Sequence, residues 1–182
     1  MAQQNTLKTA SQRKVAIDRM IRVNQAGEFG AKRIYAGQLA VMGDRTPAAR
    51  SIAHMAEQEE RHLNAFDKMM AERGVRPTAL HPIWNAAGFA LGAVSAAISP
   101  EAAMACTVAV ETEIDRHYSE QLAEIGDSDP ELSAMIADFQ ADEQEHKATA
   151  LAEGAERAPA YPLMSALVRM GCRTAIAVSK HI

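Results

Sequence analysis

The sequence is poor in aromatic residues and has only two cysteines, and both scarcities limit what the chain can be. Aromatic residues make up 4% of the 182 residues, whereas hydrophobic residues make up 48%. A chain so rich in alanine and methionine favours packed helices over a β-sandwich. Cys106 and Cys172 form neither a CxxC motif nor a disulfide framework. We therefore expect a reducing compartment, with both thiols as small buried apolar groups.

The chain also lacks a strong charge of one sign and an apolar leader. Its net charge is −4, and no basic stripe with interleaved aromatic residues is present, so we expect no nucleic-acid partner. The first residues, "MAQQNTLKTASQRK", contain no apolar segment, so we expect no secretory signal. The length suits one domain with a substantial core. We expect a flexible N-terminus over residues 1–12 and a single domain over residues 13–182.

The ends of the predicted helices are marked by local signals. Three glycines stand where a helical pattern stops, as C-terminal caps do: Gly43, Gly74 and Gly126. Three helices begin with an N-cap oxygen followed by proline: Thr46-Pro47, Ser99-Pro100 and Asp129-Pro130. Strand alternation with turn dipeptides is missing from the sequence. The pattern predicts helices over residues 13–42, 47–73, 100–125, 130–156 and 162–180.

A long connection, residues 74–99, joins the second and third of these helices. It contains a run without charge over residues 83–98. As a helix this run would span about 24 Å, which is short of the ~30 Å hydrocarbon core of a bilayer, so we do not expect it to cross a membrane. Four helices with one long central crossover are typical of ferritin-like bundles. The prediction is an all-α, ferritin-like four-helix bundle with a long apolar crossover and an extra C-terminal helix.

A repeat of carboxylates runs through the four bundle helices. Two helices carry Glu-x-x-His and two carry a lone Glu, all on otherwise apolar stripes: Glu59 and His62, Glu143 and His146, Glu28, and Glu111. The lone Glu precedes the Glu of the next helix by 31 residues in one half and by 32 residues in the other. The neighbouring Glu57, Glu60, Arg61 and Glu145 fall on other faces, which we expect to be solvated.

Buried carboxylates need compensating positive charge. An uncompensated carboxylate in a core costs several kcal/mol or stays protonated. The stripes carry no Lys or Arg near these positions, whereas two divalent metal ions would balance four carboxylates. Oxygen donors with two imidazoles and no thiolate favour iron or manganese over zinc or copper. The six residues match the ligand set of di-iron carboxylate bundles, with Glu59 and Glu143 as the expected bridges.

Four motifs together resemble one enzyme family. They are "RVNQAGEFGAKRIYAGQL" (22–39), "AEQEERHLNAF" (56–66), "ACTVAVETEIDRHYSEQL" (105–122) and "DEQEHKATA" (142–150). These stretches closely resemble the demethoxyubiquinone hydroxylases of ubiquinone biosynthesis, and the similarity covers nearly the whole chain from about residue 15. The family's metal ligands map onto the same six residues. Its His-Tyr pair maps onto His117-Tyr118.

The resemblance implies a di-iron monooxygenase with O2 as co-substrate. The enzyme would hydroxylate the ring of a polyprenylated demethoxyubiquinol, and NADH could supply electrons. The sequence contains no Gly-x-Gly-x-x-Gly motif after a strand. The electron source therefore stays open among the quinone itself, a separate reductase, and NADH bound at an unconventional site. Other ubiquinone-biosynthesis proteins and a second copy of the chain are possible partners.

Five further residues are candidates around the predicted centre. Tyr118 and His117 are candidate catalytic residues, and Tyr35 is a candidate supporting residue. Both tyrosines lie two turns beyond a lone Glu, where they could hydrogen-bond a substrate oxygen, relay an electron, or simply pack in the core. Asp142 and Asp115 are candidates to orient a metal-bound imidazole, because ligating histidines usually donate their second N–H to such a group.

The polyprenyl substrate also implies contact with a bilayer. We predict peripheral attachment through residues 83–98 and 162–180, with Trp84, Phe89 and Leu91 facing the membrane or the substrate. The alternative is that the 83–98 segment packs on the bundle. The C-terminal helix carries apolar residues beside three basic ones: Arg169, Arg173 and Lys180. The expected location is the cytoplasmic face of a bacterial inner membrane, or the mitochondrial inner membrane in a eukaryote.

Two other functions are compatible with parts of the sequence. An iron-storage or peroxide-scavenging protein of the ferritin type would use the same six ligands, so the ligands alone do not exclude it. The long apolar crossover and the "QAGEFGAKRIYAGQ" motif favour the hydroxylase. A metal-free membrane adaptor would leave four buried carboxylates without an explanation.

Overall fold

The structure, a computed structural model, describes residues 9–44 and 46–181. Over this range the chain is helical and contains no strand. Its helices are α1 (Ala10–Met42), α2 (Pro47–Arg73), α3 (His81–Ile98), α4 (Pro100–Ile125), α5 (Pro130–Ala152) and α6 (Tyr161–Ser179), with short 3-10 turns η1 (Gly126–Ser128) and η2 (Ala155–Arg157). The prediction of an all-α, ferritin-like bundle is confirmed.

The local signals at the helix ends act as expected. Three N-cap side chains each accept a hydrogen bond from a backbone N–H three residues on: Thr46, Ser99 and Asp129. Gly43, Gly74 and Gly126 all have positive φ angles, which cost glycine little. As a result α2 and α4 begin and end at the predicted residues.

Four boundaries differ from the prediction, two of them by a single residue, since α6 spans Tyr161–Ser179 rather than residues 162–180. Helix α1 begins at Ala10 rather than at residue 13, because Thr9 and Gln12 form a capping box. Residues 1–8 of the expected flexible N-terminus lie outside the described residues. Helix α5 ends at Ala152 rather than at residue 156, since Gly154 turns the chain left-handed at φ 95° and η2 follows.

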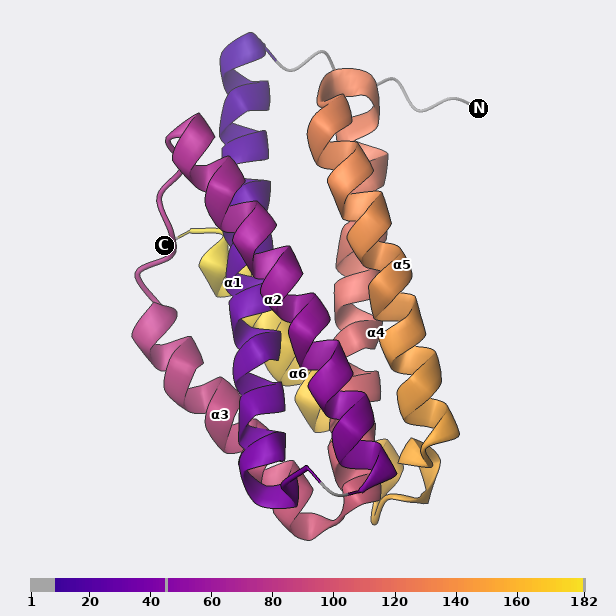
Figure 1. Cartoon of the computed structure of the whole chain (residues 1–182). Coiled ribbons are helices and arrows are strands. Elements are labelled where there is room, and N and C mark those ends of the chain that lie inside the picture. The colour runs from indigo at the N-terminus through magenta and orange to yellow at the C-terminus, as the bar shows by residue number, and fades with distance from the viewer. Residues whose placement is uncertain (1–8, 45, 182) are drawn as a thin grey trace.

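The six helices form two similar halves. Figure 1 shows the α1–α2 hairpin beside the α4–α5 hairpin, and these four helices form the bundle. The third helix of each half packs back against the first, α3 against α1 and α6 against α4. The apolar crossover and the C-terminal helix are therefore equivalent elements of the two halves.

Helix α3 approaches α1 closely through glycines. A Cβ atom on Gly92 would lie 1.9 Å from the Ile34 carbonyl oxygen, and one on Gly37 would lie 2.1 Å from the Phe89 carbonyl oxygen. The opposite side of α3 is open, with Val94 60% exposed. The crossover thus packs on the bundle along one side and faces outward along the other. Within residues 9–44 and 46–181, none of the helices combines the length and apolar character needed to cross a bilayer.

The core has a polar layer between two apolar layers. One apolar cluster contains Tyr35 and Met55, and a second contains Ile21 and Phe66. Along α1 and α2 these residues flank buried carboxylates and a buried imidazole. This polar layer, in the middle of the bundle, is the candidate site.

Candidate metal centre

The six predicted ligands lie in this polar layer, and four helices supply them. The lone glutamates come from α1 and α4, and the Glu-x-x-His pairs come from α2 and α5. None is more than 1% exposed: Glu28, Glu59, His62, Glu111, Glu143 and His146. In contrast Glu57, Glu60, Arg61 and Glu145 are exposed, in agreement with the prediction from helical geometry.

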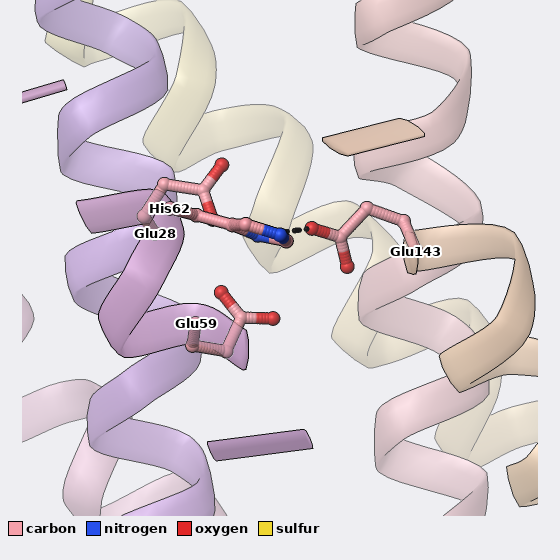
Figure 2. Close-up of side chains that lie close together, drawn as sticks. All are labelled: Glu28, Glu59, His62 and Glu143. Atoms are coloured by element: carbon pink, nitrogen blue, oxygen red, sulfur yellow. Dashed lines mark hydrogen bonds and ion pairs between the residues drawn. The ribbon is translucent and has the colours of Figure 1, made fainter. Parts of the chain in front are cut away.

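The ligand atoms form two groups that share two glutamates. One group is Glu28, Glu59, His62 and Glu143, and the other is Glu59, Glu111, Glu143 and His146; within each, the candidate ligand atoms lie within 4.8 Å of one another. Figure 2 shows the first group converging from α1, α2 and α5. Glu59 and Glu143 belong to both groups, which is where bridging ligands must lie.

Each imidazole turns its Nδ1 atom toward the carboxylates. His62 Nδ1 lies 3.1 Å from Glu143 Oε1 and 3.3 Å from Glu28 Oε2. His146 Nδ1 lies 3.0 Å from Glu143 Oε2 and 3.5 Å from Glu59 Oε1. The structure therefore assigns Nδ1 as the inward donor atom of both histidines.

The outer nitrogen of each histidine meets a residue from the opposite half. His62 Nε2 lies 2.9 Å from Asp142 Oδ2, and His146 Nε2 lies 3.1 Å from Gln58 Oε1. Asp142 thus lies beside an imidazole of the centre, the position expected for a residue that orients the ring. The Asp115 side chain instead accepts hydrogen bonds from Gln140 and Gln144, so it does not take the predicted place beside an imidazole.

Sequence reasoning missed Gln58, although a signal for it exists. Gln58 precedes Glu59, and Asp142 precedes Glu143, so each outer partner stands directly before a shared glutamate. The repeat that relates the two glutamates relates the two partners as well. A metal-bound imidazole is oriented by the group on its second nitrogen, so both residues can fix the rings in the centre.

Two tyrosines hold the glutamates that belong to one group only. The Tyr35 hydroxyl donates to Glu111 Oε1 at 2.5 Å, and the Tyr118 hydroxyl donates to Glu28 Oε1. Burial first, and then the neighbouring carboxylates, raise the pKa of both phenols well above the ordinary value. At neutral pH both tyrosines are therefore neutral hydrogen-bond donors.

His117 lies outside the cluster of carboxylates. Its Nε2 atom lies 2.8 Å from the Gln121 amide nitrogen, and Gln121 in turn exchanges two hydrogen bonds with Asn24. Burial lowers the pKa of His117 to about 4, so the ring is neutral at pH 7. It lines a cavity of about 220 Å³ together with Arg19 and Lys180.

The charges in the centre do not balance by themselves. Burial, followed by repulsion from Glu143, raises the pKa of Glu59 and of Glu111 well above the ordinary range. Burial alone would lower the pKa of His62, but hydrogen bonds to Glu143 and Glu28 outweigh it and raise that pKa to about 10. Without further positive charge, burial and repulsion therefore drive Glu59 and Glu111 toward their neutral, protonated forms.

Several acceptor atoms in the centre lack a hydrogen-bond donor. Both Glu59 oxygens and Glu111 Oε2 are buried without one among the described residues. Buried acceptors normally find a donor, and leaving them without one is costly. Unpaired oxygens that converge with two imidazoles, and without any thiolate, fit hard divalent cations such as iron or manganese.

An apolar cavity of about 410 Å³ lies between α1, α3, α4 and α6. Its wall includes Gly27 and Val110, the chain neighbours of Glu28 and Glu111. Trp84 and Leu91 line it too, and the Trp84 indole donates to Ser179 Oγ at 3.2 Å. Phe89 lies outside this lining; the residue is 37% exposed, and its ring centroid lies 5.2 Å from the Arg33 guanidinium carbon.

Helix α6 is attached to the bundle by a buried carboxylate. Glu113 accepts hydrogen bonds from Arg116, Arg169 and Arg173. Burial opposes ionisation, but the three guanidinium groups outweigh it and hold the pKa of Glu113 at about 2. Two of the basic residues expected to face an anionic surface are therefore engaged with Glu113.

Comparison with known proteins identifies the family of the chain. The family described as ubiquinone biosynthesis protein COQ7 matches residues 15–179. A Rhodospirillum rubrum protein, named 3-demethoxyubiquinol 3-hydroxylase, is 49% identical over 166 residues, which cover 91% of this chain and 78% of that protein.

Eukaryotic relatives match over a similar span. A Homo sapiens protein, named NADPH-dependent 3-demethoxyubiquinone 3-hydroxylase, mitochondrial, is 47% identical over 93% of this chain and 79% of its own length. A Saccharomyces cerevisiae protein, named 5-demethoxyubiquinone hydroxylase, mitochondrial, is 41% identical over 91% of this chain and 78% of its own length. With the family match spanning nearly all of the helical bundle and its buried centre, the chain belongs to the ubiquinone biosynthesis protein COQ7 family.

Proposed function

We propose that this protein is a di-iron monooxygenase that hydroxylates the ring of a polyprenylated demethoxyubiquinol in ubiquinone biosynthesis. The observation that carries the proposal is a buried centre of two ligand groups sharing two glutamates, in a bundle that also holds an apolar cavity. The names of the relatives supply the substrate class, because they are demethoxyubiquinol or demethoxyubiquinone hydroxylases.

The six buried residues would hold the two irons, with Glu59 and Glu143 shared between them. Bound iron would supply the one-electron and O2 chemistry that side chains lack. The protein's own contribution is to fix the donors. Asp142 and Gln58 orient the two imidazole rings. The hydroxyls of Tyr35 and Tyr118 hold the carboxylates of Glu111 and Glu28.

The apolar cavity is the proposed position of the substrate. Its walls are almost entirely apolar side chains and glycines, which suits a quinol ring with an isoprenoid tail. Gly27 and Val110, in the cavity wall, each precede a site glutamate in the chain, and we place the ring at that end of the cavity. Trp84 and Leu91 would contact the substrate there.

Access from a bilayer is the second part of the proposal. Of the eleven most exposed large apolar residues described, four lie on α3 and four on α6: Ile83, Phe89, Val94, Ile98, Leu163, Leu167, Met170 and Val178. These two helices also line the apolar cavity. We place this surface against the membrane, at the cytoplasmic face of a bacterial inner membrane or at the mitochondrial inner membrane, so that the tail can enter without crossing water.

Liposome flotation tests the membrane contact. Changing Val94 and Leu163 to Ser should reduce the fraction that floats with vesicles. The matched control changes Val15 and Val41, exposed apolar residues on α1, to Ser and should float like the wild type. Equal flotation of both variants would contradict membrane contact through α3 and α6.

The electron source is part of the same proposal. Relatives from mammals carry the name NADPH-dependent, whereas this chain has no Gly-x-Gly-x-x-Gly motif. We propose NADH or another reductant as the donor. Single-turnover assays of the iron-loaded protein with quinol alone, NADH or NADPH would identify it.

The activity itself is tested by complementation. A strain that accumulates the demethoxy intermediate should regain ubiquinone with the wild-type chain and with Glu57→Ala, an exposed neighbour of the site, but not with Glu143→Ala. Failure of well-expressed, iron-loaded wild-type protein would favour the ferritin-like alternative of iron storage or peroxide scavenging. Storage would then show as a cage-sized oligomer holding many irons per chain.

A further inference from the structure

The two halves of the centre differ in the group that contacts the outer nitrogen of the histidine. Asp142 presents a carboxylate oxygen to His62 Nε2, whereas Gln58 presents an amide oxygen to His146 Nε2. The two partners occupy equivalent positions in the repeat, so this is a difference in chemistry rather than in geometry. An anionic partner makes an imidazole a stronger donor than a neutral one does.

The side of the centre that contains His62 is also closed toward solvent. The Arg61 guanidinium pairs with Asp142 and with Asp138, at 2.8 Å for the Asp138 contact. The Phe139 ring stacks on the His62 ring with the centroids 4.0 Å apart, and Arg61 lies over the same phenyl ring. Arg61 offsets part of the Asp142 charge, but the carboxylate oxygen still contacts His62 Nε2 directly.

The His146 half opens into a cavity of about 270 Å³ between α2 and α5. Its wall contains His146 itself, Gln58, His54, Glu145 and Thr149. Of the three cavities described here, it alone has one of the six site residues in its wall. Arg50 lines it as well, so the cavity wall carries both positive and negative side chains.

We propose that the metal position formed by Glu59, Glu111, Glu143 and His146 is the weaker and more exchangeable of the two. Metal ions enter and leave the centre through the cavity beside it. Gln58 sets the lower affinity, because its neutral amide leaves His146 the weaker donor, and the cavity lets water replace ligands. This inference rests on the proposed di-metal centre.

Metal titration of the metal-free protein tests the affinity difference. With Co2+ added anaerobically and followed by calorimetry and visible absorption, the wild type should bind in two steps at least about tenfold apart. His146→Ala should remove the weaker step and keep the tighter one. Two steps of equal affinity, or loss of the tighter step in this variant, would overturn the inference.

Reciprocal exchange of the outer partners tests the cause. Gln58→Glu should strengthen the weaker step about 10-fold to 100-fold, and Asp142→Asn should weaken the tighter step by a similar factor. Helical circular dichroism of each metal-free variant checks folding. An unchanged weaker step in folded Gln58→Glu would overturn the role of Gln58. Absence of Co2+ and Fe2+ binding by folded wild-type protein would instead contradict the proposed function.

The route is tested by kinetics rather than affinity. Thr149→Phe should fill the cavity and slow Co2+ uptake, and its release to a chelator, at least about tenfold. Ala148→Phe is the matched control, because residue 148 is exposed on the same helix and lies outside the cavity wall. Uptake and release at wild-type rates in Thr149→Phe would overturn the proposed route.

Discussion

The two faces of the bundle on either side of the centre differ in polarity. On the α1 and α4 face, α3 and α6 cover the bundle, and the cavity between them is apolar. On the α2 and α5 face, the helices expose ion pairs such as Arg61 with Asp142, and the adjoining cavity is lined mainly by polar side chains. In the function proposed above, the hydrophobic substrate and the metal ions would therefore use different sides of the bundle.

The residues that support the ligands also differ between the two faces: they are uncharged on the covered face and include charged groups on the other. On the covered face, buried phenols hold Glu28 and Glu111 without adding charge. On the other face, a carboxylate and an amide hold the imidazoles, and Arg61 is half exposed there. The comparison predicts that substrate binding and metal binding can be altered separately. The first two experiments below test this, and the next two test how the covering helices are attached.

The largest effect is expected for the ligands shared by both halves. Glu59→Ala removes a ligand from both groups, whereas Glu28→Ala removes one from a single group. We expect Glu59→Ala to lose both metal ions and its hydroxylation rate to fall more than about 100-fold. Glu28→Ala should keep one ion. Metal content and turnover of the purified variants measure this. Equal metal loss in the two variants would argue against shared ligands.

A moderate effect is expected when the apolar cavity is filled. Gly171 lines it, and a Cβ atom there would meet nothing within 4 Å. Gly171→Leu should therefore lower hydroxylation about tenfold and leave metal content unchanged. The melting temperature should not fall, because Leu favours helix over Gly. Ala166→Leu, on an exposed part of α6 outside the cavity wall, is the control. Unchanged turnover in Gly171→Leu would show that the substrate does not bind in this cavity.

A smaller effect is expected at the contact that positions the covering helix. A Cβ atom on Gly92 would clash with the Ile34 carbonyl oxygen, a backbone atom that cannot easily move. Gly92→Ala should therefore destabilise the fold by about 1–3 kcal/mol, as overpacking does. Chemical denaturation measures it. A stability equal to that of the wild type would show that α3 is held less closely than this contact indicates.

The smallest effect is expected at the ionic attachment of α6, because its three arginines are partly exposed. The pKa of Glu113 is lowered to about 2 in the folded protein, below the ~4.3 of an unfolded Glu. Its stabilisation is thus present above pH 4.3 and lost as the pH falls through about 2. Melting curves should place Glu113→Gln a few degrees below the wild type near pH 6, with the gap closing toward pH 2. A gap independent of pH would mean that Glu113 acts through packing alone.

Much of the fold and of the centre could be predicted because the relevant signals are local or periodic. Caps at Thr46 and Ser99 act within one turn, and the helix ends there agree with the prediction. The six ligands share the stripe of their helix with core residues, and a carboxylate on such a stripe is visible from spacing alone. The misplaced end of α5 depends on Gly154, whose left-handed conformation the helical pattern did not reveal.

The sequence by itself determined five of the six helices, the two-fold repeat and the six carboxylate and imidazole side chains that are buried together, since helical periodicity fixes which side chains share a face. Only the tertiary structure decided which residues meet across helices. It placed Gln58 on His146, turned Asp115 toward α5, and engaged Arg169 with Glu113. It also showed that α3 packs on one side and faces outward on the other. These outcomes depend on how the helices pack and rotate against one another, and spacing within one helix carries no information about its neighbour's rotation.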